Sequence, residues 1–228
     1  SIPKIRENTR IMSVKTLFVN QISYKTSTDQ SVLDTRESWI TRGLKSLSLI
    51  DEHLKNVDMI LTDNTVGHCD ELPHAIVDSI PKQCEIVTDS SLNQHGRINP
   101  GAGNLEVSKS LKHRLTDYDF YVHHEPRTVI RHSNMFDSFF REPRNLFRNG
   151  SCHDASDDSQ VWTGTYFIST RDFIRFLEWS DLKMMCDQSI SIEYYMRTFL
   201  DSEDISFDTV QDAGILWNIK AQGVNIEV

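Results

Sequence analysis

Apolar and polar positions alternate along the first half of the chain in blocks that predict strands and helices in turn. Short runs rich in β-branched and aromatic residues predict strands at 15–22, 57–61, 84–87 and 120–122. Between these runs, apolar residues at helical spacing predict helices at about 29–55, at 71–80 and after the turn at 99–104. Strands that alternate with helices are typical of βαβ units. We therefore expect an α/β fold with a mostly parallel central sheet flanked by helices.

The pattern changes after residue 127. Residues 132–160 are rich in Arg, Asn, Ser and Asp, and predict a long, partly irregular loop with one short helix at 133–140. Further on, the pattern predicts a strand at 161–169, helices at 170–179 and 188–200, and a final strand at 214–219. We expect an N-terminal arm at 1–14 and a single domain at 15–228.

Composition narrows the class of protein. A net charge of −9 over 228 residues argues against a dedicated nucleic-acid binder, because phosphate contacts need a basic surface. No apolar run approaches the roughly 18 residues of a membrane span, so we expect no transmembrane segment. The four cysteines form no CxxC pair, which favours a reducing compartment. We expect a cytoplasmic protein, or one that is peripheral to a membrane through other partners.

Residues that could bind a ligand or act in catalysis lie where the predicted strands end. Polar residues follow three of them, at Asn20-Gln21, Asp63-Asn64 and His123-His124-Glu125. Because ligands of parallel sheets bind outside the carboxyl ends of the strands, these residues are expected to line one rim. A glycine-rich turn, Asn99 to Asn104, opens the helix before the last of these strands. A flexible backbone bend together with His, Glu and Arg side chains suits a phosphate-bearing ligand.

The order of these features resembles the GT-A fold of nucleotide-sugar glycosyltransferases. The resemblance covers about residues 15–200 and is carried by a first strand followed by a long helix, and by a second strand that ends in Asp63. Two further features support the resemblance. One is the Gly/Asn turn before the charged strand end, and the other is the strand of Trp162–Phe167, which an acidic helix follows. It implies transfer of a sugar from a nucleotide-diphosphate donor to a glycan or lipid-linked glycan acceptor.

The resemblance also implies roles by position. Asp63 resembles the acid that contacts the nucleotide base, and Gly101, Gly103 and Asn104 resemble the turn that packs against the nucleoside. Read from the residues alone, the same aspartate could cap the next helix or form a hydrogen bond within a turn, and the glycines could serve only backbone geometry. The candidate donor-binding residues are Asp63, Gly101, Gly103, Asn104, Glu125, Arg127, Thr163 and Gly164.

The chain departs from the family at its metal motif. His123, Glu125 and Arg127 occupy the place of the DxD motif that normally holds a divalent metal on the diphosphate, whereas Asp117-Tyr118-Asp119 precedes the strand. His123 and Glu125 alternate onto one strand face and could bind Mn²⁺ or Mg²⁺. Alternatively Arg127, with Arg131 or Arg148, could neutralise the diphosphate without metal. Glu125 and Arg127 could also form a structural salt bridge.

An inverting enzyme of this kind needs a carboxylate base within reach of the acceptor hydroxyl. Asp187 and Glu193 follow the Thr163-Gly164 strand, where the resemblance places this base, and the sequence does not choose between them. A retaining enzyme would not require it. We expect His124, Trp39 and Trp162 to be core residues rather than ligands.

Three other functions stay open. A sugar-nucleotide-forming nucleotidyltransferase usually carries a glycine-rich loop after its first strand, but Ser23–Thr28 contains no glycine. A metal-dependent hydrolase would use the nine histidines, which are scattered without an HxH or HExxH motif. A non-catalytic nucleotide- or glycan-binding module would keep ligand binding when Asp187 and Glu193 are neutralised.

Overall fold

A computed structural model describes residues 14–151, 154–218 and 225–227. Within these residues, seven strands form a central sheet in the order β3-β2-β1-β4-β7-β6-β8. Their bounds are β1 Thr16–Ile22, β2 Asp58–Asp63, β3 Cys84–Thr88, β4 Phe120–His124, β6 Leu146–Asn149, β7 Val161–Ser169 and β8 Asp208–Val210. β1, β2, β3 and β4 are mutually parallel, and β7 runs antiparallel to both of its neighbours. The predicted α/β fold with a mostly parallel central sheet is confirmed.

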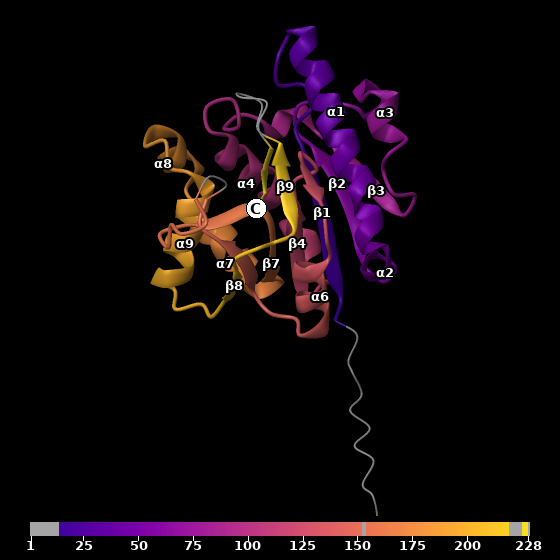
Figure 1. Cartoon of the computed structure of the whole chain (residues 1–228). Coiled ribbons are helices and arrows are strands. Elements are labelled where there is room, and N and C mark those ends of the chain that lie inside the picture. Colours follow the sequence, from indigo (N-terminus) through magenta and orange to yellow (C-terminus); the bar gives the residue numbers. More distant parts are fainter. Residues whose placement is uncertain (1–13, 152–153, 219–224, 228) are drawn as a thin grey trace, which may run out of the picture.

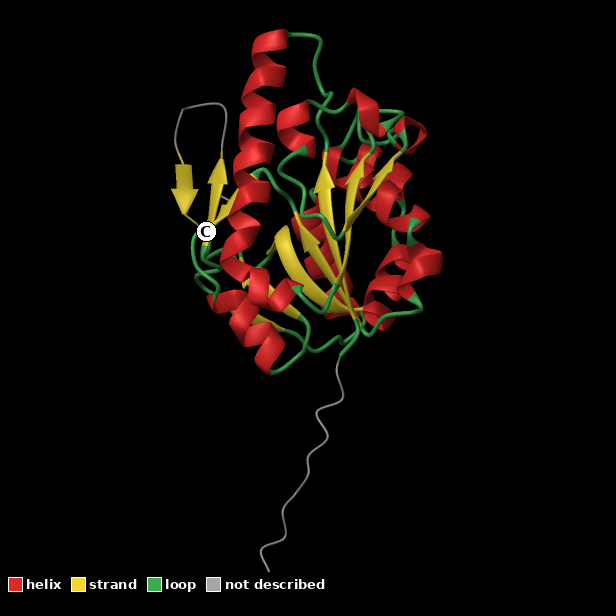
Figure 2. Ribbon diagram, turned by 90° about the vertical axis from the view of Figure 1, so that its right-hand side faces the viewer, coloured by secondary structure: helices red, strands yellow, loops and turns green. Residues whose placement is uncertain are grey.

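Helices cover both faces of this sheet (Figure 1, Figure 2). One apolar layer packs under α1 Gln30–Ser46, α2 Asp51–Leu54, α3 His74–Val77 and α6 Asn134–Arg141. The opposite layer packs under α4 Pro100–Ser110, α5 Lys112–Leu115, α7 Thr170–Trp179, α8 Leu182–Asp187 and α9 Ile192–Ser202. Among the described helices, none combines the length and apolar composition that crossing a bilayer requires.

A smaller sheet lies beside α1 (Figure 2). It contains β5 Thr128–Ile130, β9 Ile215–Asn218 and β10 Asn225–Glu227, with β9 in the centre and antiparallel to both neighbours. β5 follows β4 directly, so the carboxyl end of β4 is held between the two sheets. The segment from Glu125 to Arg127 makes this connection and carries the charged cluster noted in the sequence.

Most predicted elements are present, with shifted ends. The long helix expected at 29–55 is divided into α1, a 3-10 turn at Leu47–Ile50 and α2, and the helix expected at 188–200 begins at Ile192. The expected final strand is β9, and residue 219 lies outside the described residues, as does the predicted arm at 1–14 except for Val14. Trp162 and His124 are fully buried as expected, whereas Trp39 is only partly buried.

The interpretation of residues 132–160 as mainly loop was wrong in one respect. The expected short helix is present as α6, but residues 146–149 form β6, which pairs with β7 and β8 inside the central sheet. All four β6 residues are buried, including Arg148, which is 3% exposed. The strand was missed because two of its four residues are Arg and Asn, which rarely fill buried positions.

Gly43 brings α1 unusually close to the end of β4. A Cβ atom at this position would lie 1.8 Å from the Pro126 carbonyl oxygen and 2.5 Å from the Thr128 carbonyl oxygen. One turn later, the Ser46 hydroxyl accepts a hydrogen bond of 2.9 Å from the Ile130 backbone nitrogen. α1 is therefore fixed against the segment that contains Arg127, and only a residue without a side chain allows this approach.

We predict that Gly43→Ala destabilises the protein by about 1–3 kcal/mol, because the added methyl group must displace backbone atoms. At an unhindered helix position the same substitution would instead stabilise the protein, because Ala is favoured over Gly by about 1 kcal/mol. Urea unfolding would measure the change. Ser38→Ala, at an exposed position of the same helix, is the control and should leave stability unchanged or slightly higher. Equal stability of Gly43→Ala and the native chain would contradict the close approach.

Candidate active site

A cavity of about 910 Å³ opens at the carboxyl ends of β1, β2 and β4. The N-terminal parts of α4 and α9 form much of its remaining wall. The structure brings most of the predicted site residues together around it, namely Gly101, Gly103, Asn104, Glu125, Arg127, Thr163, Gly164 and Glu193. Three predicted residues, Asp63, His123 and Asp187, are not among those that line it. The volume lies within the range usual for cofactor and substrate sites.

A chain of hydrogen bonds holds Glu125 at the centre of the cavity wall. The Gln21 amide donates to Asn104 Oδ1 over 3.1 Å, and Asn104 Nδ2 donates to Glu125 Oε1 over 2.9 Å. Arg127 Nη2 donates to the other carboxylate oxygen of Glu125. Burial alone would raise the pKa of Glu125, but Arg127 and His123 outweigh it and lower the pKa to about 2. Glu125 is therefore a charged structural acid, and the salt bridge considered from the sequence is present.

His123 and Glu125 do not fit a divalent metal. Both Glu125 oxygens already accept hydrogen bonds, and a cation bound to this carboxylate would be repelled by Arg127. His123 is 3% exposed, its Nδ1 lies 3.2 Å from the Tyr121 hydroxyl, and its Nε2 lies 3.9 Å from Glu125 Oε1. Mn²⁺ and Mg²⁺ prefer about six oxygen-rich ligands, which this closed pair does not offer.

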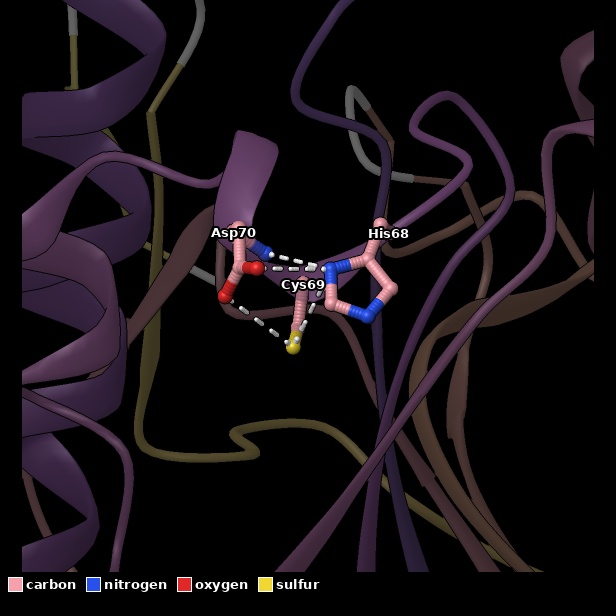
Figure 3. A group of neighbouring side chains, drawn as sticks. All are labelled: His68, Cys69 and Asp70. Carbon is pink, nitrogen blue, oxygen red and sulfur yellow. Dashed lines mark hydrogen bonds and ion pairs between the residues drawn. The ribbon is translucent and has the colours of Figure 1, made fainter.

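One other group of metal-type ligands converges in the described part of the chain. His68, Cys69 and Asp70 are consecutive residues whose ligand atoms lie within 4.8 Å of one another (Figure 3). His68 Nδ1 accepts a hydrogen bond from the Asp70 backbone nitrogen, and Glu71 completes a capping box around this 3-10 turn. The His68 and Asp70 side chains are mostly exposed. Local capping of the turn therefore accounts for this arrangement.

The glycines of the predicted phosphate turn have a packing role. Asn99 caps α4, and its side-chain oxygen accepts hydrogen bonds from the Gly101 and Ala102 backbone nitrogens. A Cβ at Gly101 would lie 2.8 Å from Ile192 Cβ, and one at Gly103 would lie 2.5 Å from Gly96 Cα. The first backbone N–H groups of α4 are thus already bonded. The two glycines shape the cavity wall by close packing rather than by offering N–H groups to phosphate.

Asp63 is enclosed behind the cavity. It is 1% exposed and accepts hydrogen bonds from the Tyr24 backbone nitrogen and from both the backbone nitrogen and the hydroxyl of Thr65. These contacts fix the loop that follows β1 and the turn that follows β2. Of the two structural roles considered from the sequence, a helix cap and a hydrogen bond within a turn, the structure shows the turn. The neighbouring Asn64 and Thr65 line the cavity in its place.

The two candidate bases have different surroundings. Glu193, in the first turn of α9, lines the cavity and accepts a hydrogen bond of 3.3 Å from the Thr163 hydroxyl. Burial, with a contribution from Glu125, raises the pKa of Glu193. Asp187 ends α8, has a side chain 57% exposed, and pairs with Lys183 outside the cavity. The structure therefore favours Glu193 and does not bring Asp187 to the site.

Thr163 and Gly164 contact Glu193 and Glu125, respectively. Gly164 accepts a backbone hydrogen bond of 2.8 Å from Glu125, which places the start of β7 beside the end of β4. A Cβ at Gly164 would lie 2.2 Å from the Trp162 ring, so the glycine allows this buried tryptophan to pack. Both residues line the cavity, and both also shape the start of the strand.

Several cavity residues had escaped the sequence analysis. Ser23 and Lys25 follow the end of β1, where the rule that ligands lie beyond strand ends could have found them. Arg36 lies in the second turn of α1, and its Nε donates to the Ser23 carbonyl oxygen over 2.6 Å. Nothing in the pattern of an amphipathic helix distinguishes this arginine from its exposed neighbours.

We predict that the stabilising effect of Glu125 disappears in acid. Because its pKa is lowered in the folded protein, its contribution is complete above the ordinary glutamate pKa and is lost as the pH falls towards about 2. Glu125→Gln should destabilise the protein at pH 7 by less than the roughly 3–5 kcal/mol typical of fully buried pairs. The loss is reduced because the Arg127 side chain is 32% exposed.

Urea unfolding between pH 7 and pH 2.5 measures this effect. The difference in stability between the native chain and Glu125→Gln should shrink as the pH falls. Glu142→Gln, at an exposed position, is the matched control and should show a small difference at every pH. A difference for Glu125→Gln that does not change with pH would show that the carboxylate is not held as a charge.

No protein-family model matches the chain, and no curated protein does. The chemistry of the cavity must therefore be inferred from its own residues. These residues are the ion pair of buried Glu125 with half-buried Arg127, the neutral amides and hydroxyls near β2, and a carboxylate with a raised pKa near β7.

Proposed function

We propose that this chain is a glycosyltransferase that moves a sugar from a nucleotide-diphosphate donor to a hydroxyl of a glycan or lipid-linked glycan acceptor. The observation that carries the proposal is the order of chemical groups across the cavity. Asn64 and Thr65 lie beyond β2, Glu125 and Arg127 beyond β4, and Glu193 beside the start of β7. Neutral polar groups, the Glu125–Arg127 ion pair and the Glu193 carboxylate thus follow one another along the wall.

This order matches the order of groups in an extended donor. The nucleoside needs neutral hydrogen-bonding partners, the diphosphate needs positive charge, and the reacting sugar carbon needs a base beside it. From β2 to β7 the sheet order spans three strand spacings, about 14 Å in all. The same proposal assigns the chain to the GT-A fold, on the order of elements that suggested the resemblance.

Glu193 has the role of general base in this proposal. It takes the proton from the acceptor hydroxyl while the hydroxyl oxygen forms a bond to the anomeric carbon of the donor sugar. The bond between that carbon and the diphosphate oxygen breaks, and the nucleoside diphosphate leaves with the electron pair. A partly buried carboxylate with a raised pKa is suited to accepting a proton as a general base. Inversion at the anomeric carbon follows from this single displacement.

Positive charge near the leaving group is the second requirement. Negative charge develops on the departing diphosphate and must be stabilised in the transition state. Arg127 lines the cavity. Burial raises the pKa of Glu193, and the charge of Arg127 opposes this rise only in part, so the guanidinium also acts on the base. Because His123 and Glu125 do not fit a divalent metal, no step is assigned to one.

We predict that Glu193→Gln lowers kcat by about 10²- to 10⁴-fold while donor binding is retained, because only proton transfer is lost. Asp187→Asn is the matched control and should leave kcat unchanged. In the native enzyme kcat should fall as the pH is lowered through the raised pKa of Glu193, since the base must be deprotonated. Turnover of nucleotide sugars at several pH values measures both effects. Equal losses in the two variants, or none in either, would exclude Glu193 as the base.

We predict that one class of nucleotide diphosphate and its sugar conjugates raises the melting temperature. At a ligand concentration of 100 times Kd, mass action should give a shift of about 5–10 °C. The corresponding nucleoside, which lacks the diphosphate, is the control and should shift the melting temperature less. If no UDP-, GDP-, CDP- or dTDP-linked compound changes the melting temperature, the proposed function is wrong.

A further inference from the structure

Arg36 lines the cavity, and its guanidinium forms no salt bridge with a carboxylate among the described residues. It belongs to α1, which packs on the opposite face of the sheet from α4, and its Nε donates a hydrogen bond to the Ser23 carbonyl oxygen. Glu125 and Asp63 both act on Arg36 as nearby negative charges, but Glu125 is bonded to Asn104 and Arg127, and Asp63 accepts hydrogen bonds from Tyr24 and Thr65. Arg36 therefore presents positive charge to the cavity.

Arg127 presents a second guanidinium to the same cavity. Its pairing with Glu125 fixes it after the end of β4, and its side chain remains 32% exposed. Burial lowers the pKa of Arg36 to about 10, and the charge of Arg127 contributes to this shift. Two arginines that repel each other in this way face a shared space. Such a pair is stabilised when an anion binds between its members.

The other cations of the cavity are less suited to hold an anion at this point. Lys25 pairs with Glu71 over 3.3 Å, and its side chain is 55% exposed. Arg97 is exposed at the rim, in the turn before α4. The N–H groups at the start of α4 are occupied by Asn99. Arg36 and Arg127, which are both partly buried, are the remaining cations that line the cavity.

We propose that Arg36 and Arg127 together bind the diphosphate of the donor as a two-arginine clamp, so that donor binding requires no divalent cation. This inference rests on the proposed function and names the groups that recognise its substrate. Guanidinium groups form paired hydrogen bonds with phosphate oxygens, and two of them can contact both phosphates of a diphosphate. The clamp spans α1 and β4, which Gly43 holds at a fixed separation.

Inorganic pyrophosphate is the probe that tests the clamp without a nucleoside or sugar. Isothermal titration in EDTA should show that the native chain binds it. Arg36→Gln and Arg127→Gln should each weaken binding by about 10- to 100-fold, the loss expected for charge-assisted hydrogen bonds. Arg36→Lys should recover part of the loss, since it restores charge without the planar fork. Arg42→Gln, at an exposed position of the same helix, is the matched control and should bind as the native chain does.

The melting temperature of each variant shows whether it is folded. If Arg36→Gln does not fold, the comparison of Arg36→Lys with the native chain still tests the clamp. Binding that needs Mn²⁺, or that survives in Arg36→Gln, overturns the clamp. The proposed function then still stands if nucleotide sugars are turned over. Conversely, pyrophosphate binding that depends on Arg36, without turnover of any nucleotide sugar, supports the clamp as an anion site and contradicts the glycosyltransferase.

Discussion

The buried negative charge of Glu125 is the constraint around which the site is organised. A carboxylate that is 6% exposed is tolerated only if hydrogen bonds and an opposite charge replace the water it has lost. Asn104 supplies one bond from α4, and Arg127 supplies the charge from the segment before β5. The backbone of Glu125 is bonded to Gly164 and Thr128 as well. One residue thereby fixes α4, β7 and the small sheet relative to the end of β4.

Close backbone contacts give this arrangement its shape. Gly43 lets α1 reach the Pro126 carbonyl, and Gly103 lets α4 reach the backbone of Gly96. In both cases a methyl group would occupy space already filled by backbone atoms, which cannot move as a flexible side chain can. The cavity is thus the space left between two helices that are held at set distances from the sheet. Its polar groups keep their positions because the elements that carry them cannot approach or separate freely.

The sequence predicted the strands and the rim better than the individual roles. Apolar runs end where polar residues begin, and this boundary placed Glu125 and Arg127 at the cavity correctly. It placed Asp63 there too, although tertiary hydrogen bonds from Tyr24 and Thr65 enclose that side chain. The sequence did not distinguish Asp187 from Glu193, because both follow the same strand and only the packing of α8 and α9 shows which of them lines the cavity. Arg36 was missed because its contact depends on how α1 lies against the sheet.

The charge of the whole chain and the charge of the cavity impose different limits on a ligand. A net charge of −9 disfavours a polyanion such as nucleic acid, which must contact an extended surface. A small dianion inside the cavity is repelled less by the surface acids, because their field is screened beyond about 8 Å at physiological ionic strength. Arg36 and Arg127 both line the cavity, so their charges would act on a bound ligand at shorter range than the surface acids do. A net negative charge on the whole chain is therefore compatible with the proposed binding of a small dianion in the cavity.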